Sequence, residues 1–181
     1  MTLQKQPVMT NDELRDLLAP YRDTYPADAD IDIATYTCAC CFSRDEVNSI
    51  ARWKFQTDRR RLTRTLNLLA TNTDFDFQNL TSRALRNQDD LAALLLAMEL
   101  NGVGKAFGSA ILMAADPCRF SVLDYRAARA LQALGYLTDC STPTPENPAP
   151  WVRYLAAARD VAERTGWTLR NVDRALWEAG G

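Results

Sequence analysis

The sequence contains no histidine among its 181 residues. Histidine is the usual general base beside a serine or cysteine nucleophile, so its absence excludes catalytic sites of the Ser–His and Cys–His types. Acid–base chemistry must then come from carboxylates, lysine, tyrosine or the backbone. Long apolar runs are also missing, because no stretch approaches the roughly 18 consecutive apolar residues of a membrane-spanning helix. We therefore do not expect a membrane protein.

The cysteines are few and poorly spaced for a metal site. Cys38, Cys40 and Cys41 stand together, whereas Cys118 and Cys140 stand alone. This spacing matches neither the zinc nor the iron–sulfur motifs, and without histidine a second ligand pair is missing. We expect no metal and no cofactor, and cysteines that behave as small buried apolar side chains in a reducing compartment.

The remaining composition is that of an ordinary globular protein. Apolar residues make up 47% of the chain and charged residues 24%, which predicts one domain covering residues 1–181. The first residues (MTLQKQPVMTNDEL) lack the basic flank and apolar core of a secretory signal. The expected location is the cytoplasm, and we expect a monomer.

The net charge of −2 argues against a broadly basic nucleic-acid-binding protein, but the charges are unevenly distributed. Residues 50–64 contain one acid and six cations, namely Arg52, Lys54, Arg59, Arg60, Arg61 and Arg64. Such a local patch can attract phosphate even in an acidic protein. The alternative is an ordinary solvated basic face.

The apolar spacing indicates helices almost throughout, and hence an all-α fold. The expected helices are residues 11–19, ended by Pro20; a helix after the Ser43-x-x-Glu46 capping box; residues 60–69; residues 77–87; a helix from Asp89-Asp90; one ended by Asp116-Pro117; residues 124–134; residues 151–164; and about 170–179. Ile31, Ile33 and Tyr36 indicate a short extended piece. Residues 138–150 contain four prolines and indicate a long loop.

The clearest pattern is a pair of apolar helices within residues 91–115, joined by Leu100-Asn-Gly-Val-Gly-Lys105. Gly102 and Gly104, on either side of Val103, both tolerate a positive φ and so allow a tight connection. The second helix is apolar on nearly every side, so it lacks the polar side chains with which a recognition helix reads base edges. The exposed part is the hairpin, whose backbone N–H groups and Lys105 can bind phosphate without reading sequence.

Asp124 follows the apolar run Phe120-Ser-Val-Leu at the start of the next expected helix. A carboxylate there can stabilise positive charge that develops on a sugar, or orient an attacking water. The alternative is a helix cap, because Ser121-x-x-Asp124 also fits a capping box. The two roles can coexist.

These residues resemble the helix–hairpin–helix (HhH-GPD) superfamily of DNA glycosylases. The superfamily has an L-x-G-V-G hairpin, an A-x-A-I-L run in the following helix, and P-x-x-x-x-V-D before the next. Similar in order and spacing are Leu100-Asn-Gly-Val-Gly, Gly108-Ser-Ala-Ile-Leu112 and Pro117-Cys-Arg-Phe-Ser-Val-Leu-Asp124. The resemblance is strong over residues 91–134. It is weaker over Arg52-Trp-Lys54 and Arg174-Ala-Leu-Trp177, which are similar to small bacterial members.

The resemblance implies two helical lobes that flank a cleft, and an enzyme that flips a damaged or modified base out of duplex DNA and cleaves its N-glycosidic bond. The family's catalytic aspartate falls on Asp124. The lysine nucleophile of bifunctional members falls on Ala106, and Lys105 lies one residue early, roughly 100° around the helix. A monofunctional enzyme that uses water is therefore expected. The four-cysteine cluster loop of some members is absent, since no cysteine follows Cys140.

Candidates for a base pocket are Trp53, Lys54, Tyr36 and Phe42, with the alternative that the aromatic side chains belong to the core and Lys54 to the solvated surface. Two other functional interpretations stay open. The chain can be a non-catalytic helix–hairpin–helix DNA-binding module, or a regulatory protein unrelated to DNA. The discriminating observation is whether Asp124 lies in an open cleft or is covered by packed side chains.

Overall fold

The structure, a computed structural model, describes residues 9–25, 31–137 and 149–181. The prediction of an all-α fold is confirmed for these residues, which contain no strand. The elements are α1 (Asn11–Arg22), the 3-10 helix η2 (Ile33–Thr35), α2 (Arg44–Lys54), α3 (Arg59–Leu69), α4 (Asp74–Arg86), α5 (Asp90–Met98), α6 (Lys105–Ala115), α7 (Tyr125–Ala133), α8 (Ala149–Thr165) and α9 (Leu169–Ala179). In the described part of the chain, no helix is long and apolar enough to cross a membrane.

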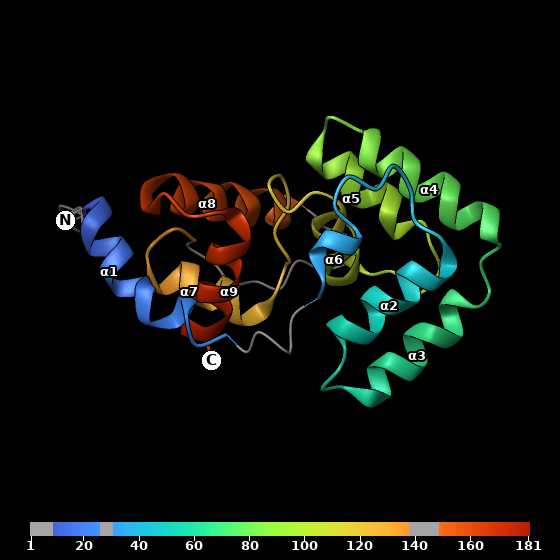
Figure 1. The fold of residues 1–181 in the computed structure, drawn as a ribbon, viewed down its shortest axis with the longest axis horizontal. Helices are drawn as coiled ribbons and strands as arrows, with labels where there is room; N and C mark the ends of the chain where they lie inside the picture. The colour runs from blue at the N-terminus through green and yellow to red at the C-terminus, as the bar shows by residue number, and fades with distance from the viewer. Residues whose placement is uncertain (1–8, 26–30, 138–148) are drawn as a thin grey trace, which may run out of the picture.

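The helices gather in two groups around α6. Figure 1 shows α2, α3, α4 and α5 towards one end of the molecule, and α1 with α7, α8 and α9 towards the other. Helix α1 packs against α9 and α8, so the first and last described helices lie together. Helix α6 packs against α2, α4 and α5, and all its residues from Phe107 to Ala115 are buried. The expectation that the second hairpin helix is buried is therefore confirmed.

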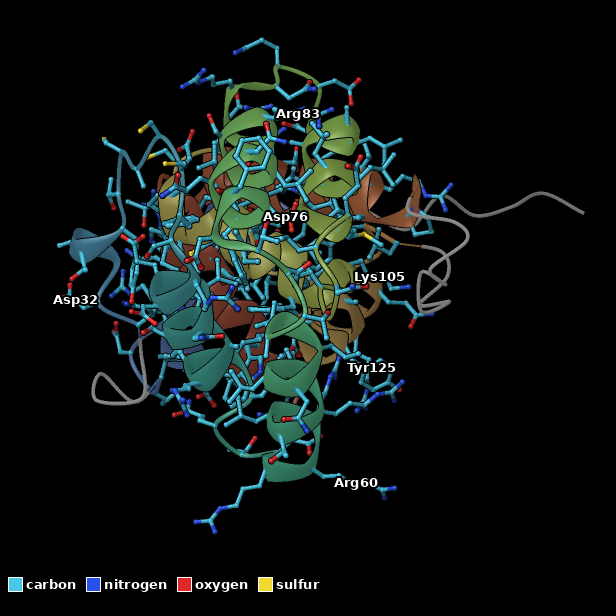
Figure 2. All side chains as sticks on the ribbon, turned by 90° about the vertical axis from the view of Figure 1, so that its right-hand side faces the viewer. Asp32, Arg60, Asp76, Arg83, Lys105 and Tyr125 are labelled. Carbon is cyan, nitrogen blue, oxygen red and sulfur yellow. The ribbon has the colours of Figure 1, made fainter. Side chains whose placement is uncertain are left out.

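Helix starts follow the capping signals. Capping boxes begin three helices: Thr10 with Glu13 at α1, Ser43 with Glu46 at α2, as expected from the sequence, and a third, Thr73 with Asp76, at α4. The third box explains why α4 begins at Asp74 rather than at residue 77 as expected. The charged side chains of Arg60 and Arg83 are exposed and lie towards the bottom and the top of the molecule in Figure 2.

The expected end of the first helix at Pro20 was wrong. Helix α1 continues through Pro20 to Arg22. Proline removes one N–H from the helix, which frees the carbonyl of Asp16. Asp16 is exposed, so water can hydrate that carbonyl, while the buried side chains of Leu14 and Leu18 hold the helix in place.

The extended piece expected around Ile31, Ile33 and Tyr36 was also wrong. The chain forms the 3-10 helix η2 there, because Thr35 closes a turn onto Asp32. The Thr35 backbone N–H donates to the Asp32 carbonyl at 3.1 Å, and its hydroxyl donates to the Asp32 carboxylate at 2.9 Å. Most of the loop predicted over residues 138–150 lies outside the described residues; its last two residues, Ala149 and Pro150, begin α8.

A cluster of three charged residues joins α5 to α8. Asp90, the first residue of α5, accepts hydrogen bonds from Arg119 Nε at 2.9 Å and from Arg159 Nη1 at 2.7 Å. Arg159 also donates to the Arg119 carbonyl. Burial alone would raise the pKa of Asp90, but the hydrogen bonds from the two arginines lower it. Since α5 and α8 belong to different groups of helices, this cluster helps to hold the groups together.

The substitution Asp90→Asn should lower the free energy of unfolding by about 1–2 kcal/mol near neutral pH, because it removes the negative charge that both arginines contact. A carboxylate with a lowered pKa stabilises the fold above the ordinary value of 3.8 and ceases to do so as the pH falls through its folded-state pKa. Urea denaturation near neutral pH and at about pH 3 should therefore show a difference that shrinks on acidification. The control is Asp89→Asn, since Asp89 caps α5 and asparagine caps equally well. A difference independent of pH would contradict this account.

Candidate active site

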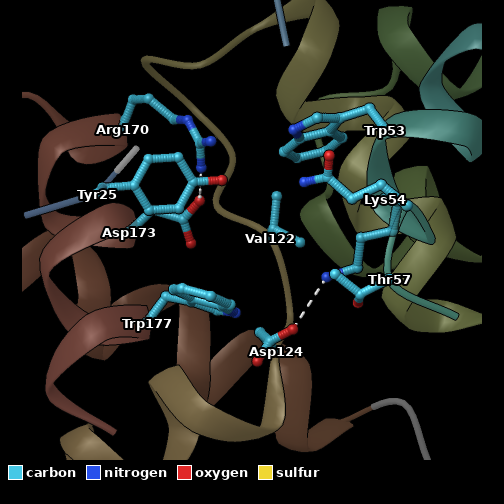
Figure 3. Close-up of a pocket in the computed structure, with 10 residues that line it drawn as sticks. Tyr25, Trp53, Lys54, Thr57, Val122, Asp124, Arg170, Asp173 and Trp177 are labelled. Carbon is cyan, nitrogen blue, oxygen red and sulfur yellow. Dashed lines mark hydrogen bonds and ion pairs between the residues drawn. The ribbon is translucent and has the colours of Figure 1, made fainter. Parts of the chain in front are cut away.

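A cavity of about 470 Å³ opens between α2 and α9. Ligand sites in proteins fall within roughly 300–1,000 Å³, so its size suits a small organic group. Figure 3 shows α9 on one side, the end of α2 on the other, and the segment leading to α7 at the back. The cavity is lined by Tyr25, Trp53, Lys54, Gln56, Thr57, Val122, Asp124, Arg170, Asp173 and Trp177.

Asp124 lies in this cavity and also caps a helix. Its Oδ1 accepts the backbone N–H of Arg126 at 2.9 Å at the start of α7, and its Oδ2 accepts from Lys54 Nζ at 3.1 Å. The exposed fraction is 24% for the Asp124 side chain and 12% for Lys54. The capping and cavity roles therefore coexist, with one carboxylate oxygen for each. Lys54 is not the solvated surface lysine of the alternative interpretation.

The expected capping box from Ser121 to Asp124 does not form, because Asp124 is itself the N-cap. Ser121 instead donates its hydroxyl to Asp173 Oδ1 at 2.9 Å. The serine precedes the helix by too many residues to reach its first free N–H groups.

The short segment before Asp124 is held from two sides. Ser109 of α6 accepts the Leu123 N–H at 2.8 Å, and the Tyr154 hydroxyl of α8 donates to the Val122 carbonyl at 2.9 Å. Burial, and then the nearby Asp173 carboxylate, raise the pKa of Tyr154 well above 10, which keeps it a donor. These contacts fix the backbone from which the Asp124 side chain projects.

Asp173 is a second carboxylate in the cavity that the sequence analysis missed. It is 4% exposed, accepts from Ser121, and forms an ion pair with Arg170 one turn earlier on α9. Burial raises the pKa of Asp173, although Arg170, Ser121 and Lys54 each act to lower it. A signal was present, because Leu169, Val172, Asp173 and Leu176 occupy the i, i+3, i+4 and i+7 positions of a buried helix face.

Of the four candidates for a base pocket, two line the cavity and two lie elsewhere. Trp53 and Lys54 line it, at the end of α2, and Trp53 also packs against the core. Tyr36 and Phe42 are not among the residues that line the cavity. They form an edge-to-face pair 6.0 Å apart, and Phe42 is fully buried. Tyr25 and Trp177 supply aromatic surface that the sequence did not indicate.

The two glycines of the hairpin between α5 and α6 differ in conformation and in surroundings. Of the two glycines expected to tolerate a positive φ, Gly102 adopts one, at +91°, whereas Gly104 has φ −90°. Gly104 is the N-cap of α6, and a Cβ there would meet nothing within 4 Å. Asn72 braces the turn, accepting from the Asn101 N–H at 2.9 Å and donating to its carbonyl at 3.1 Å. The N-terminus of α6 is thus presented at an uncrowded point.

The other predicted phosphate contacts lie on or beside α3 and α6. Val103 is buried beneath the hairpin, and Lys105 is half-buried at the first position of α6. Arg59, Arg60 and Arg61 form the exposed first turn of α3, and the Arg61 guanidinium lies 4.7 Å above the Phe55 ring. In Figure 2, Lys105 and Tyr125, the residue after Asp124, lie along one side, with Arg60 below them.

The cysteines do not form a metal site in the described part of the chain, which contains no group of three or more residues suited to hold a metal ion. The expectation that they are buried was wrong for Cys38, Cys40 and Cys118, which are exposed, and for Cys41, which is half-buried. The loop contacts α6 through its backbone instead, with the Cys38 N–H donating to the Ala115 carbonyl at 3.0 Å. Cys140 lies outside the described residues.

Comparison of the chain with protein-family models, curated proteins and solved structures finds no match. The cavity and the hairpin are therefore the features from which a function is inferred.

The two hairpin glycines should respond differently to substitution. Gly102→Ala should lower the free energy of unfolding by about 1–3 kcal/mol, because φ is positive and the new Cβ would lie 2.9 Å from Leu68 Cβ and 3.0 Å from the Thr65 carbonyl oxygen. Gly104→Ser is the matched control, since it fits the open space and adds a capping hydroxyl. Thermal unfolding of both variants is the measurement. Equal destabilisation by the two substitutions would contradict this account, because only Gly102 has a positive φ and a crowded Cβ position.

Proposed function

We propose that this protein is a monofunctional DNA glycosylase, which flips a damaged or modified base from duplex DNA and hydrolyses its N-glycosidic bond. The observation that carries the proposal is the position of Asp124 in an open cavity rather than beneath packed side chains. That was the feature expected to distinguish an enzyme from a non-catalytic helix–hairpin–helix module. The resemblance of residues 91–134 to the helix–hairpin–helix glycosylases supports the same interpretation.

In this proposal the two groups of helices are the two lobes, and the cavity between α2 and α9 is the cleft that receives the base. DNA lies across the hairpin and the first turn of α3, where backbone N–H groups and arginines bind phosphates. Such contacts position the duplex without reading its sequence. The enzyme acts on cytoplasmic DNA as a monomer.

Cleavage of the glycosidic bond builds positive charge on the sugar. A carboxylate that is already oriented stabilises this charge more than it stabilises the neutral ground state, which lowers the barrier. Asp124 is oriented by the Arg126 N–H and by Lys54, so it needs little rearrangement during the reaction. The same carboxylate can orient the water that completes hydrolysis.

No lyase step is included in the proposal. Ala106 stands where bifunctional members carry their lysine, and Lys54, the lysine that lines the cavity, forms an ion pair with Asp124. An ammonium group in such a pair has no lone pair with which to attack the sugar.

Asp124→Asn should reduce base excision by at least about 10²-fold, because it removes the charge that stabilises the transition state. DNA affinity should stay within a few-fold of wild type or increase, since the substitution removes an anion near the DNA backbone. Asparagine still caps α7, so folding should survive. The measurements are single-turnover excision and equilibrium binding, with Asp89→Asn, the same change at another helix cap, as control.

The wild-type product should be an intact abasic site that breaks only on alkali treatment, and borohydride should trap no protein–DNA adduct. An adduct through Lys54 or Lys105 would contradict the monofunctional mechanism. Binding of DNA without release of any base would favour the non-catalytic module.

The basic turn of α3 should make DNA binding depend on salt. Replacing Arg59, Arg60 and Arg61 by glutamine should flatten the plot of log K against log salt by up to about 0.9 for each phosphate that the variant no longer neutralises. Arg60→Gln alone should flatten the slope by about 0.9, the value for one phosphate. Arg83→Gln, on the exposed surface of α4, should leave the slope unchanged. Equal slopes for these two single variants would identify the α3 arginines as an ordinary solvated face.

A further inference from the structure

Every aromatic ring that lines the cavity already lies beneath an arginine. The distances from guanidinium carbon to ring centroid are 5.5 Å for Arg170 over Trp53, 5.6 Å for Arg170 over Tyr25, 5.6 Å for Arg174 over Tyr25, and 4.0 Å for Arg126 over Trp177. A cation over a ring is attracted by the negative charge of its face. Each ring thus already has a guanidinium over one face, so a cationic base stacked on the other face would lie close to an existing positive charge.

The acids of the cavity are likewise occupied by cations. Asp124 forms an ion pair with Lys54, and Asp173 forms one with Arg170. A cationic base in the cavity would lie beside the positive charges of Lys54 and Arg170. The two carboxylates that could compensate its charge are already paired with these side chains. Like charges at such short range are unfavourable in a partly buried site. The cavity is thus better suited to a neutral base.

Arg170 and Asp173 place a hydrogen-bond donor beside an acceptor at one end of the cavity. Both are more than nine-tenths buried, and both line it. Figure 3 shows the Arg170 guanidinium above Asp173, facing the space between α9 and α2. A guanidinium presents its donors in a planar fork, and each carboxylate oxygen has two lone pairs. A carbonyl beside a ring N–H is the complementary edge.

We propose that the base taken into this cavity is neutral and carries a lactam edge, with its carbonyl oxygen at Arg170 and the adjacent ring N–H at Asp173. Oxidised and deaminated bases such as 8-oxoguanine, hypoxanthine and uracil have this edge without a positive charge, whereas guanine alkylated at N7 and adenine alkylated at N3 are cationic in the nucleotide. This inference rests on the proposed glycosylase function and names its substrate class. Normal guanine and thymine share the edge, so selection against them comes from the pairing that keeps them in the duplex.

The wild-type enzyme provides a test that does not depend on the folding of a variant. Duplexes carrying 8-oxoguanine, hypoxanthine or uracil are compared with duplexes carrying 7-methylguanine or 3-methyladenine. The pair 8-oxoguanine and 7-methylguanine is matched, since both have the lactam edge and only the second has a cationic ring. Single-turnover rates are divided by the spontaneous loss of each base. We expect this ratio of enzymatic to spontaneous rate to be larger for the neutral lactam bases than for the cationic bases.

Two substitutions of Arg170 test its contact with the base. Arg170→Met removes the donors, and Arg170→Lys keeps the charge but loses the planar fork. Both should reduce excision of the neutral lactam bases by about tenfold or more, relative to any residual excision of 3-methyladenine, which lacks the lactam edge. Arg83→Met, remote on α4, is the matched control, and thermal unfolding checks the fold of each variant.

The outcomes separate the two proposals. A greater enhancement for 7-methylguanine and 3-methyladenine would overturn the inferred base class and leave the glycosylase function standing. An equal loss on all lesions in the Arg170 variants would mean that Arg170 only supports the fold, and would overturn its role in recognition. Release of no base from any duplex would overturn the glycosylase function itself.

Discussion

The ion pair between Lys54 and Asp124 is the interaction on which the arrangement of the site depends. It joins the end of α2 to the start of α7, and these helices belong to different groups around α6. Partly buried ion pairs cost desolvation energy, and apolar contacts of similar size often stabilise a fold better. Its contribution to stability is therefore expected to be small, and its position in an open cavity agrees with the role proposed for Asp124. The same carboxylate caps α7, so its side chain is already held in one orientation. A catalytic group that is held in this way loses little conformational entropy during a reaction.

The rigid surroundings of this pair come from the burial of α6. Because α6 is buried against α2, α4 and α5, the positions of its two ends are well defined. The hairpin precedes one end, braced by Asn72, and the segment that leads to Asp124 follows the other, held by Ser109 and Tyr154. The hairpin turn and the Asp124 carboxylate can thus keep a constant separation. In a glycosylase that separation would relate the DNA backbone to the extruded nucleotide.

The arginines around the cavity give the site its electrostatic character. Arg126 and Arg170 lie over aromatic rings that line the cavity, and Arg170 also pairs with the Asp173 carboxylate. Buried charges are tolerated only when they are paired, and here the pairing also defines a donor and an acceptor in one wall. The cavity combines flat apolar surface for stacking with a few polar groups of fixed direction, which is the general construction of a small-molecule site.

The sequence by itself determined the helices, the burial of α6 and the hairpin, because these depend on apolar spacing, capping residues and glycine over a few neighbouring positions. It also identified Asp124 as a helix cap and as the candidate residue of a site. Only the tertiary structure decided what Asp124 faces. Asp173 meets Ser121 across 52 residues of sequence, and Lys54 meets Asp124 across 70. Local sequence patterns carry no information about such contacts. Asp173 could therefore be recognised in the sequence as an acid on an apolar helix face, but the residues that contact it could not be predicted.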